Sequence, residues 1–321
     1  MPYTENKTYR PPFFLFNRHL ETIYPALFRK VKITKPKRER LELADGDFLD
    51  LDWYKKESKK LVIINHGLEG SSDRAYVLGI VKIFLDNKWD ALAWNFRGCS
   101  GEMNRLPRFY HSGETGDLNN VILHAGKTYD TIFLVGFSLG GNMMLKYLGE
   151  FSDNLPRQIC GASTFSVPIQ LYDSCLEIMK PHNVLYQKRF LNNLKKKALE
   201  KNKMFPDAFD IERVMQASTI MEFDDSLTAP VHGFAGAEDY YKKNSSLQFL
   251  NKISVPTLLI NAKNDPMLSE NCYPVELSKN HEFLFFEKWN YGGHVGFSTN
   301  SAHYKSEEKA MDFAENLINE Q

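Results

Sequence analysis

The stretch that most constrains the fold lies at residues 131–150, where an apolar run meets a serine flanked by glycines. Residues 131–135 are apolar or β-branched, as is typical of a buried strand, and the motif GFSLG follows at 136–140. A helix-like pattern then continues to residue 150. A G-x-S-x-G motif between a strand and a helix places its serine on a sharp, strained turn, because only small residues fit beside it. We therefore expect Ser138 to stand exposed on such a turn, although the motif alone could be an ordinary tight turn.

Further short apolar runs indicate buried strands, and segments of helical length lie between them. Strands are expected at 61–65, 91–96, 257–261 and 283–286, and helices for example at 76–87 and 118–128. Continuous apolar strands that alternate with helices predict an α/β fold, with a mostly parallel central sheet and helices on both faces. Chemistry in such sheets takes place at the carboxyl ends of the strands.

Residues 168–230 depart from this alternation. The segment is rich in Lys, Leu, Tyr, Phe and Met and has no obvious strand, and its part 185–201 has the pattern of an amphipathic helix. The strand pattern resumes after Pro256. We expect one α/β domain over residues 1–321, with a helical cap insertion at about 168–230.

A serine hydroxyl is a weak nucleophile unless a base takes its proton and a third group orients that base. On a sheet of this kind the expected chain order is Ser, then Asp or Glu, then His, each after a strand. Asp265 is the first acid after the strand at 257–261, and His294 lies in a glycine-rich loop after the next strand. The sequence therefore predicts that Ser138, Asp265 and His294 form a catalytic triad.

Other assignments remain open for the acid and the base. Asp265 could simply form a turn before Pro266, and a histidine in a glycine-rich loop is more often a polar surface residue. The competing acids are Asp224, Asp225 and Asp239, none of which immediately follows a clear strand. The competing histidines are His66, His111 and His232, and the last of these precedes the strand before Asp265 and breaks the expected order.

Two backbone N–H groups are expected to hold the oxyanion of an acyl-transfer reaction. The first belongs to Leu139, at the N-terminus of the helix after Ser138. The second belongs to Leu68, because residues 66–70 read HGLEG directly after a strand and match the H-G-x-x-G form of an oxyanion loop. We expect His66 to brace this loop and not to act as a base.

The composition limits the binding partners, the kinds of structural site and the cellular location that we expect. Lys plus Arg and Asp plus Glu both total 40, so the formal net charge of +0 offers no overall field for nucleic acid. The four cysteines are scattered without a C-x-x-C pair, so neither a structural zinc site nor a disulfide framework is expected, and a cytoplasmic location fits. The sequence shows neither the layout of a signal peptide nor a run of the roughly 18 apolar residues that a membrane span requires. We expect the reaction to need no cofactor or metal. The oligomeric state stays open.

Seven motifs in a fixed order give the chain a family resemblance. They are NRHLETI at 17–23, HGLEGS at 66–71, NFRGCSGE at 95–102, HSGET at 111–115, GFSLGGN at 136–142, FDD at 223–225 and GGHVGF at 292–297. On these motifs the chain resembles the α/β-hydrolases, and among them the YheT-like, EMB8-like and ABHD-type esterases, over nearly its whole length. The resemblance implies a carboxylic-ester hydrolase whose substrate is poorly defined.

We interpret the chain as a serine esterase that cleaves a small-molecule or lipid-like carboxylic ester through an acyl-enzyme. A lipase, a thioesterase or an amidase would use the same triad and differ only in the shape of its pocket. A non-catalytic binding protein on the same fold is a further alternative, because a fold alone does not fix a function.

Overall fold

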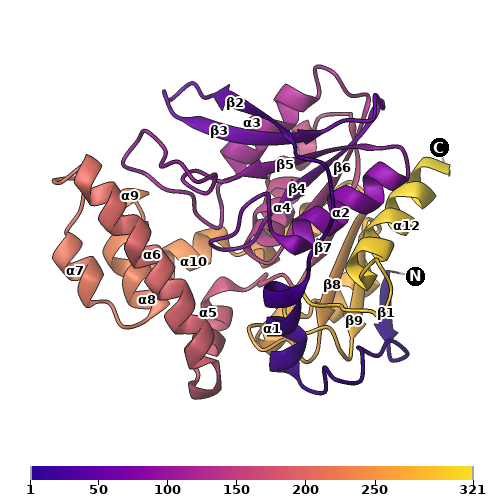
Figure 1. Cartoon of the computed structure of the whole chain (residues 1–321). Helices are drawn as coiled ribbons and strands as arrows, with labels where there is room; N and C mark the ends of the chain where they lie inside the picture. The colour runs from indigo at the N-terminus through magenta and orange to yellow at the C-terminus, as the bar shows by residue number, and fades with distance from the viewer. Residues whose placement is uncertain (1, 320–321) are drawn as a thin grey trace.

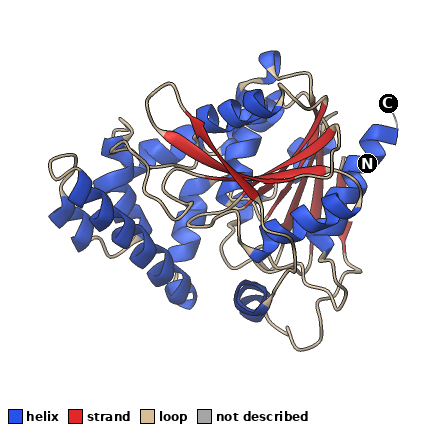
Figure 2. Ribbon diagram, turned by 45° about the horizontal axis from the view of Figure 1, so that its top comes forward, coloured by secondary structure: helices blue, strands red, loops and turns tan. Residues whose placement is uncertain are grey.

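The computed structural model describes residues 2–319, which form a nine-stranded sheet with helices packed on both sides (Figures 1 and 2). The strand order across the sheet is β1-β9-β8-β7-β6-β4-β5-β3-β2. The strands are β1 (Tyr3–Asn6), β2 (Lys37–Glu42), β3 (Phe48–Tyr54), β4 (Lys60–Asn65), β5 (Asp90–Asn95), β6 (Thr131–Phe137), β7 (Ile159–Phe165), β8 (Thr257–Ala262) and β9 (Leu284–Trp289).

The strand β3 runs antiparallel to both of its neighbours, β2 and β5, and all the other strand pairs run parallel. The predicted α/β architecture with a mostly parallel sheet is therefore confirmed. The five strands expected from the sequence are all present, with bounds that differ by a few residues at most.

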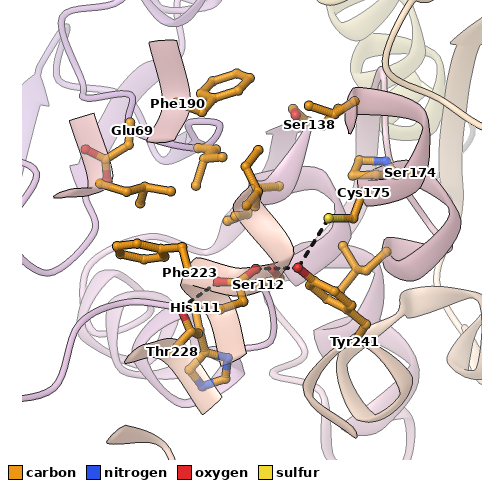
Figure 3. A pocket seen from close by; sticks show the side chains of 18 of the residues that line it. Glu69, His111, Ser112, Ser138, Ser174, Cys175, Phe190, Phe223, Thr228 and Tyr241 are labelled. Atoms are coloured by element: carbon orange, nitrogen blue, oxygen red, sulfur yellow. Dashed lines mark hydrogen bonds between the residues drawn. The ribbon is translucent and has the colours of Figure 1, made fainter. Parts of the chain in front are cut away.

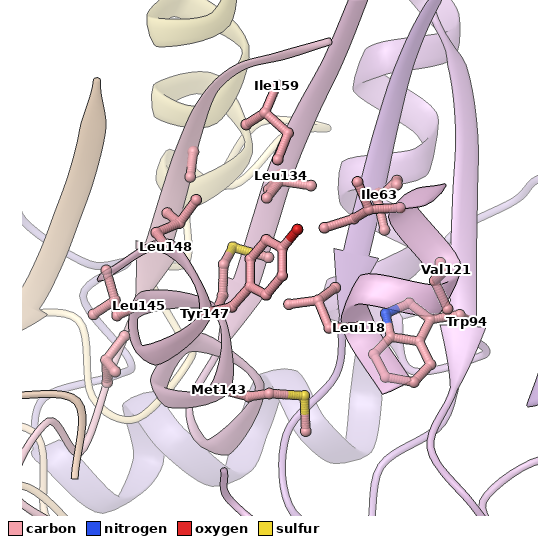
Figure 4. Packing of buried hydrophobic residues seen from close by; sticks show 14 of the residues in the cluster. Ile63, Trp94, Leu118, Val121, Leu134, Met143, Leu145, Tyr147, Leu148 and Ile159 are labelled. Atoms are coloured by element: carbon pink, nitrogen blue, oxygen red, sulfur yellow. The ribbon is translucent and has the colours of Figure 1, made fainter. Parts of the chain in front are cut away.

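Helices cover both faces of the sheet because the strand side chains alternate between two apolar layers. Leu61 and Ile63 of β4 point into the layer under α3 (Thr115–Ala125) and α4 (Leu139–Glu150). Val62 and Ile64 point into the opposite layer, under α2 (Ala75–Asp86) and α12 (Lys305–Asn319). Figure 4 shows the first layer, where Ile63 and Leu134 of the sheet face Leu118 and Tyr147 of the helices.

Four strands, β1, β2, β3 and β7, were not predicted from the sequence. The strand β7 reads ICGASTF and lacks a long apolar run, yet its interior residues are buried between neighbours on both sides. The strand β3 carries Asp50 and Asp52, which look like surface residues in the sequence. Both are buried, and they pair with Arg40 and Arg38 of the adjacent β2.

Between β7 and β8 the chain is helical and forms a body beside the sheet, on the left of Figure 1. Its elements are α5 (Leu171–Met179), η2 (Pro181–Asn183), α6 (Val184–Met204), α7 (Ile211–Gln216), α8 (Ile220–Phe223), η3 (Asp224–Thr228), α9 (Ala229–Val231), α10 (Ala237–Asn244) and η4 (Ser246–Lys252). Two small apolar clusters hold it together, and one of them includes Phe109 from the loop after β5.

The remaining helical elements are α1 (Arg18–Phe28), η1 (Ser152–Asn154), η5 (Glu270–Cys272) and α11 (Val275–Lys279). None of the helices within residues 2–319 has both the length and the apolar character that crossing a membrane requires.

Candidate active site

Ser138 occupies the turn between β6 and α4, at the carboxyl end of a strand in the middle of the sheet. Its backbone has φ 51° and ψ −122°, a sparsely populated conformation for a residue with a Cβ. The turn can be this sharp because its neighbours lack side chains. A Cβ on Gly136 would lie 2.8 Å from the Cα of Gly141, and a Cβ on Gly140 would collide with the carbonyl oxygen of His66. The strand, the turn and the helix thus lie where the sequence predicts them.

The structure brings Ser138, His294 and Asp265 into one hydrogen-bonded chain. The Nε2 atom of His294 lies 2.9 Å from Oγ of Ser138, and its Nδ1 atom lies 2.8 Å from Oδ2 of Asp265. Asp265 follows β8 and His294 follows β9, so each side chain leaves the same edge of the sheet. The three residues, widely separated in the sequence, therefore meet at the carboxyl ends of neighbouring parallel strands.

Burial and hydrogen bonding define the roles that the ring nitrogens of His294 can take. The Asp265 side chain is 0% exposed, and its second oxygen accepts the backbone N–H of Met267 at 2.8 Å. A carboxylate in this position can only accept, so Nδ1 of His294 carries the proton of that hydrogen bond. In the neutral ring Nε2 is then an acceptor, and it faces the hydroxyl of Ser138.

Helix α1 holds the loop that carries His294. The buried carboxylate of Glu21 accepts the N–H of Gly292 at 2.8 Å and the side-chain amide of Asn264 at 2.6 Å. The hydroxyl of Thr22 accepts the N–H of His294 itself at 2.9 Å. One turn of α1 thus fixes both the histidine loop and the loop that carries Asp265.

These positioning residues were not predicted from the sequence. Glu21 and Thr22 lie in the motif at 17–23, which was noted for the family resemblance and was given no chemical role. That motif was the one available signal, because the contacts join residues more than 240 positions apart. Burial raises the pKa of Glu21, and the two N–H donors on its oxygens oppose that rise.

The loop after β4 passes directly beside Ser138. A Cβ on Gly67 would lie 3.2 Å from Cβ of Ser138, so this glycine permits the close approach. Leu68 and Leu139 both line the cavity that contains Ser138. Within residues 2–319, the backbone N–H of neither leucine donates a hydrogen bond to a protein acceptor.

His66 braces this loop from beneath. It is fully buried, its Nε2 atom accepts the N–H of Phe96 at 3.2 Å, and its Nδ1 atom lies 2.8 Å from the carbonyl oxygen of Gly67. Burial lowers the pKa of His66 to about 3, so the ring stays neutral at physiological pH. With both nitrogens bonded to backbone, His66 is not placed to act as a base at Ser138.

Glu69 links the same loop to the helical body. Its carboxylate pairs with Lys197 of α6 at 2.8 Å and accepts the hydroxyl of Tyr110 at 2.8 Å. The Nζ atom of Lys197 also lies 3.3 Å from the thiol of Cys99. Burial raises the pKa of Cys99 to about 11, so this thiol is protonated and does not compete with Ser138 as a nucleophile.

An apolar cavity of about 130 Å³ runs from Ser138 into the space between the sheet and the helical body. Its walls include Leu68 and Leu139 of the core and Phe190, Leu194 and Phe223 of the helices. Figure 3 shows Ser138 on one side of this cavity and Thr228 and Tyr241 on the far side. The far side is polar, because these two hydroxyls donate to the carboxylate of Asp224, each at 2.6 Å.

A second cavity of about 160 Å³ reaches Ser138 and His294 from another direction. It runs between α1 and α6, and its walls include Ile23 and Ala26 on one side and Tyr186 and Arg189 on the other. Ser138 therefore stands where two cavities of different character meet.

His111, Glu114 and His232 are the one group among residues 2–319 whose side chains converge like metal ligands. Their hydrogen bonds do not suit a cation. Nδ1 of His111 accepts the N–H of Gly113 at 3.1 Å, so the proton of the neutral ring sits on Nε2, the nitrogen that faces Glu114. Arg108 is already paired with Glu114. The carboxylate of Glu114 is thus engaged in a partly buried ion pair with Arg108.

Comparison with known proteins agrees with the fold described above. Residues 60–300 match the family model of the alpha/beta hydrolase fold. The Escherichia coli protein YheT, named as a candidate esterase, is 39% identical over 290 residues, which cover 88% of this chain and 84% of that protein. The bovine phospholipase ABHD3 is 28% identical over 303 residues, which cover 91% of this chain and 73% of that protein.

Among solved structures, the Pyrococcus furiosus esterase Pf2001 has the same fold. It superposes with a TM-score of 0.59 at 16% sequence identity, and the match covers 90% of this chain and 98% of the esterase.

Proposed function

The chain belongs to the alpha/beta hydrolase family as a carboxylic ester hydrolase, and we propose that it cleaves its ester through an acyl-enzyme formed on Ser138. The observation that carries this proposal is the hydrogen-bonded chain from Ser138 through His294 to Asp265 at the meeting point of two cavities. The tautomer that this chain imposes leaves Nε2 of His294 free to accept the serine proton, as general-base catalysis requires.

The proposed reaction has two halves. Oγ of Ser138 attacks the ester carbonyl carbon while its proton passes to Nε2 of His294, and Asp265 stabilises the imidazolium that forms. The C–O bond to the alcohol then breaks, the alcohol leaves with the proton from Nε2, and the acyl group remains on Oγ. A water molecule then gives a proton to the same nitrogen and attacks the acyl carbon. The bond between that carbon and Oγ breaks, Nε2 returns the proton to Oγ, and the carboxylic acid leaves with Ser138 and His294 restored.

The N–H groups of Leu68 and Leu139 are the proposed donors to the oxyanion. Both lie beside Ser138 in the first cavity, and both amides are without a protein acceptor within residues 2–319. Each donor of this type is typically worth ~10²–10³ in turnover.

The two cavities suggest where the two parts of the ester bind. We assign the acyl chain to the apolar cavity between the sheet and α6, and the alcohol to the cavity between α1 and α6. Residues 168–230 then act as the cap over the acyl side. Lipid-like esters fit an apolar acyl cavity, and the phospholipase name of one relative agrees with that class.

A labelling experiment tests the mechanism. A fluorophosphonate probe should label Ser138 of the wild-type protein, and Ser138→Ala should abolish both labelling and ester turnover. Ser174→Ala is the matched control, because Ser174 lines the same cavity but bonds to Cys272 and not to His294. Full activity of Ser138→Ala would exclude the mechanism.

A panel of substrates separates the alternative hydrolase activities that Ser138, Asp265 and His294 could support. Esters, thioesters and amides of matched acyl length would distinguish an esterase or lipase from a thioesterase and an amidase. Turnover of none of them, together with an unlabelled Ser138, would support a binding protein instead.

A further inference from the structure

The N-terminal segment carries an exposed apolar strip that the proposed reaction does not use. We define the strip as six residues with exposed side chains: Phe13, Phe14, Phe16, Tyr24, Leu27 and Phe28. The exposed fractions reach 92% for Phe13, 80% for Phe16 and 63% for Phe28. Single exposed apolar side chains are common on proteins, but a cluster of large ones marks an interaction surface.

Four aromatic rings of the strip form a continuous row. The centroids of Phe13 and Phe14 are 5.8 Å apart, those of Phe14 and Tyr24 are 5.1 Å apart, and those of Tyr24 and Phe28 are 5.2 Å apart. The strip therefore extends from the loop before α1 along the outer side of the helix. The inner side is occupied, because Glu21, Thr22 and Pro25 are buried.

The charges around the strip have one sign. From Arg10 to Lys32 the chain carries five lysines and arginines, and Glu21 is the single acidic residue. Arg29 is paired with the buried Glu307, so the cations that flank the strip are the other four. Because Glu21 is buried, it contributes no negative charge to the surface. The strip is bounded in the sequence by Arg10 and Arg18 and by Lys30 and Lys32. This local excess occurs in a chain whose formal net charge is +0.

The strip also borders the proposed alcohol cavity. Ile23 and Ala26 line that cavity on the flank of the same helix. Across the cavity, α6 begins with Val184 and Leu185, which are 40% and 72% exposed. His19 stacks on Tyr186 with ring centroids 5.8 Å apart, so α1 and the start of α6 are held together. Figure 1 shows α1 at the lower edge of the molecule, away from the central strands.

We propose that the apolar strip docks onto an anionic lipid surface, with its aromatic side chains in the interfacial region and the flanking cations against the headgroups. Aromatic and aliphatic side chains combined with lysine and arginine are the composition by which proteins lie on a membrane without spanning it. The charges favour a lipid surface over a protein, because an anionic membrane satisfies every exposed cation of the segment at once, whatever its position. Docking does not depend on the proposed catalysis, but it would place the mouth of the alcohol cavity at the source of a lipid-like ester.

Vesicle binding by the full chain tests the docking surface. The Ser138→Ala variant is used so that lipids stay intact, and it is sedimented with phosphatidylcholine vesicles that contain about a third phosphatidylserine or none. We expect binding to the anionic vesicles only, and a loss of binding as salt is raised. Substituting Phe13, Phe16 and Phe28 together by Ser should weaken binding at least about tenfold.

A matched control uses apolar residues exposed elsewhere on the protein. Leu123→Ser and Leu199→Ser change side chains that are 50% and 41% exposed on α3 and α6, and they should leave vesicle binding unchanged. In a protein with Ser138 intact, the triple Phe variant should hydrolyse a short water-soluble ester as the wild type does. That activity separates a failure of docking from a failure of the proposed function. Absence of vesicle binding, equal binding to neutral vesicles, or an equal loss in the control variants would overturn the proposal.

Discussion

Glu21 accepts a hydrogen bond from the backbone N–H of Gly292 at 2.8 Å, although 271 positions of the chain separate the two residues. The same carboxylate accepts the amide of Asn264, one residue before the acid of the proposed triad. A single buried side chain from α1 therefore sets the distance between the two loops that carry Asp265 and His294. Glu21 does not touch the reacting atoms, so we regard it as a positioning residue.

Replacing Glu21 by Gln should lower turnover without weakening substrate binding. In the wild type, Gly292 and Asn264 each donate to a different oxygen of Glu21. A glutamine replaces one of these oxygens by an NH₂ group, so one of the two donors loses its acceptor. A small displacement of the His294 loop would follow, and we expect kcat to fall about 10- to 100-fold with KM nearly unchanged. Steady-state kinetics on a soluble ester measures both constants.

The control for that variant is Glu307→Gln. Glu307 is also a buried carboxylate and pairs with Arg29, the residue after α1, at 2.5 Å, but it does not contact the His294 loop. Its loss should reduce thermal stability and leave kcat close to the wild-type value. Similar kinetic losses in both variants would show that Glu21 supports stability alone.

Asp265→Asn should inactivate the enzyme through the tautomer of His294. The asparagine can present its amide N–H to Nδ1, which moves the ring proton to Nε2 and removes the acceptor for Ser138. We expect kcat to fall by ~10⁴ while the folded structure persists. Turnover combined with circular dichroism checks both parts, and activity above a tenth of the wild type would contradict the assignment of Asp265.

Asp224 should make stability depend on pH in mildly acidic solution. Burial raises the pKa of its carboxyl from 3.8 to about 6. Because the folded-state value lies above the unfolded one, the folded protein holds a proton that the unfolded chain has released, and stability falls as pH rises from about 4 to about 6. Above about pH 6 the contribution is constant.

The variant Asp224→Asn isolates this contribution. Thr228 and Tyr241 can keep hydrogen bonds to an amide, because a hydroxyl can donate or accept. The stability of Asp224→Asn relative to the wild type should increase between about pH 4 and pH 6, by about 1–3 kcal/mol, and then level off. Denaturant unfolding at several pH values measures the difference, and a difference independent of pH would show that Asp224 is ionised throughout.

Filling the first cavity should shorten the preferred acyl chain. Leu194→Trp adds bulk to the wall of α6 that faces this cavity. We expect kcat/KM for a long acyl ester to fall about tenfold or more relative to an acetyl ester of the same alcohol. Ala26→Trp, in the second cavity, should instead discriminate between large and small alcohols. If Leu194→Trp changes the alcohol preference, the two cavities are assigned the wrong way round.

Structure could be predicted from the sequence where residues close together in the chain determine it. The strand, the turn at Ser138 and helix α4 could be predicted, because the steric limits at Gly136 and Gly140 act within a few residues. The strands β2 and β3 could not, because the charges of Asp50 and Asp52 are neutralised only by arginines on the paired strand. The role of Glu21 could not be predicted for the same reason, because its hydrogen-bond partners lie more than 240 positions further along the chain.

The ion pair between Glu69 and Lys197 connects helix α6 to the loop that carries the Leu68 amide. If α6 swings outward to admit an acyl chain, it pulls on the residue next to the proposed oxyanion donor. With α6 in the outward position the enzyme would then be inactive, and ester cleavage would begin only after the helix has returned. Under that movement the ion pair would make substrate loading and bond cleavage successive events.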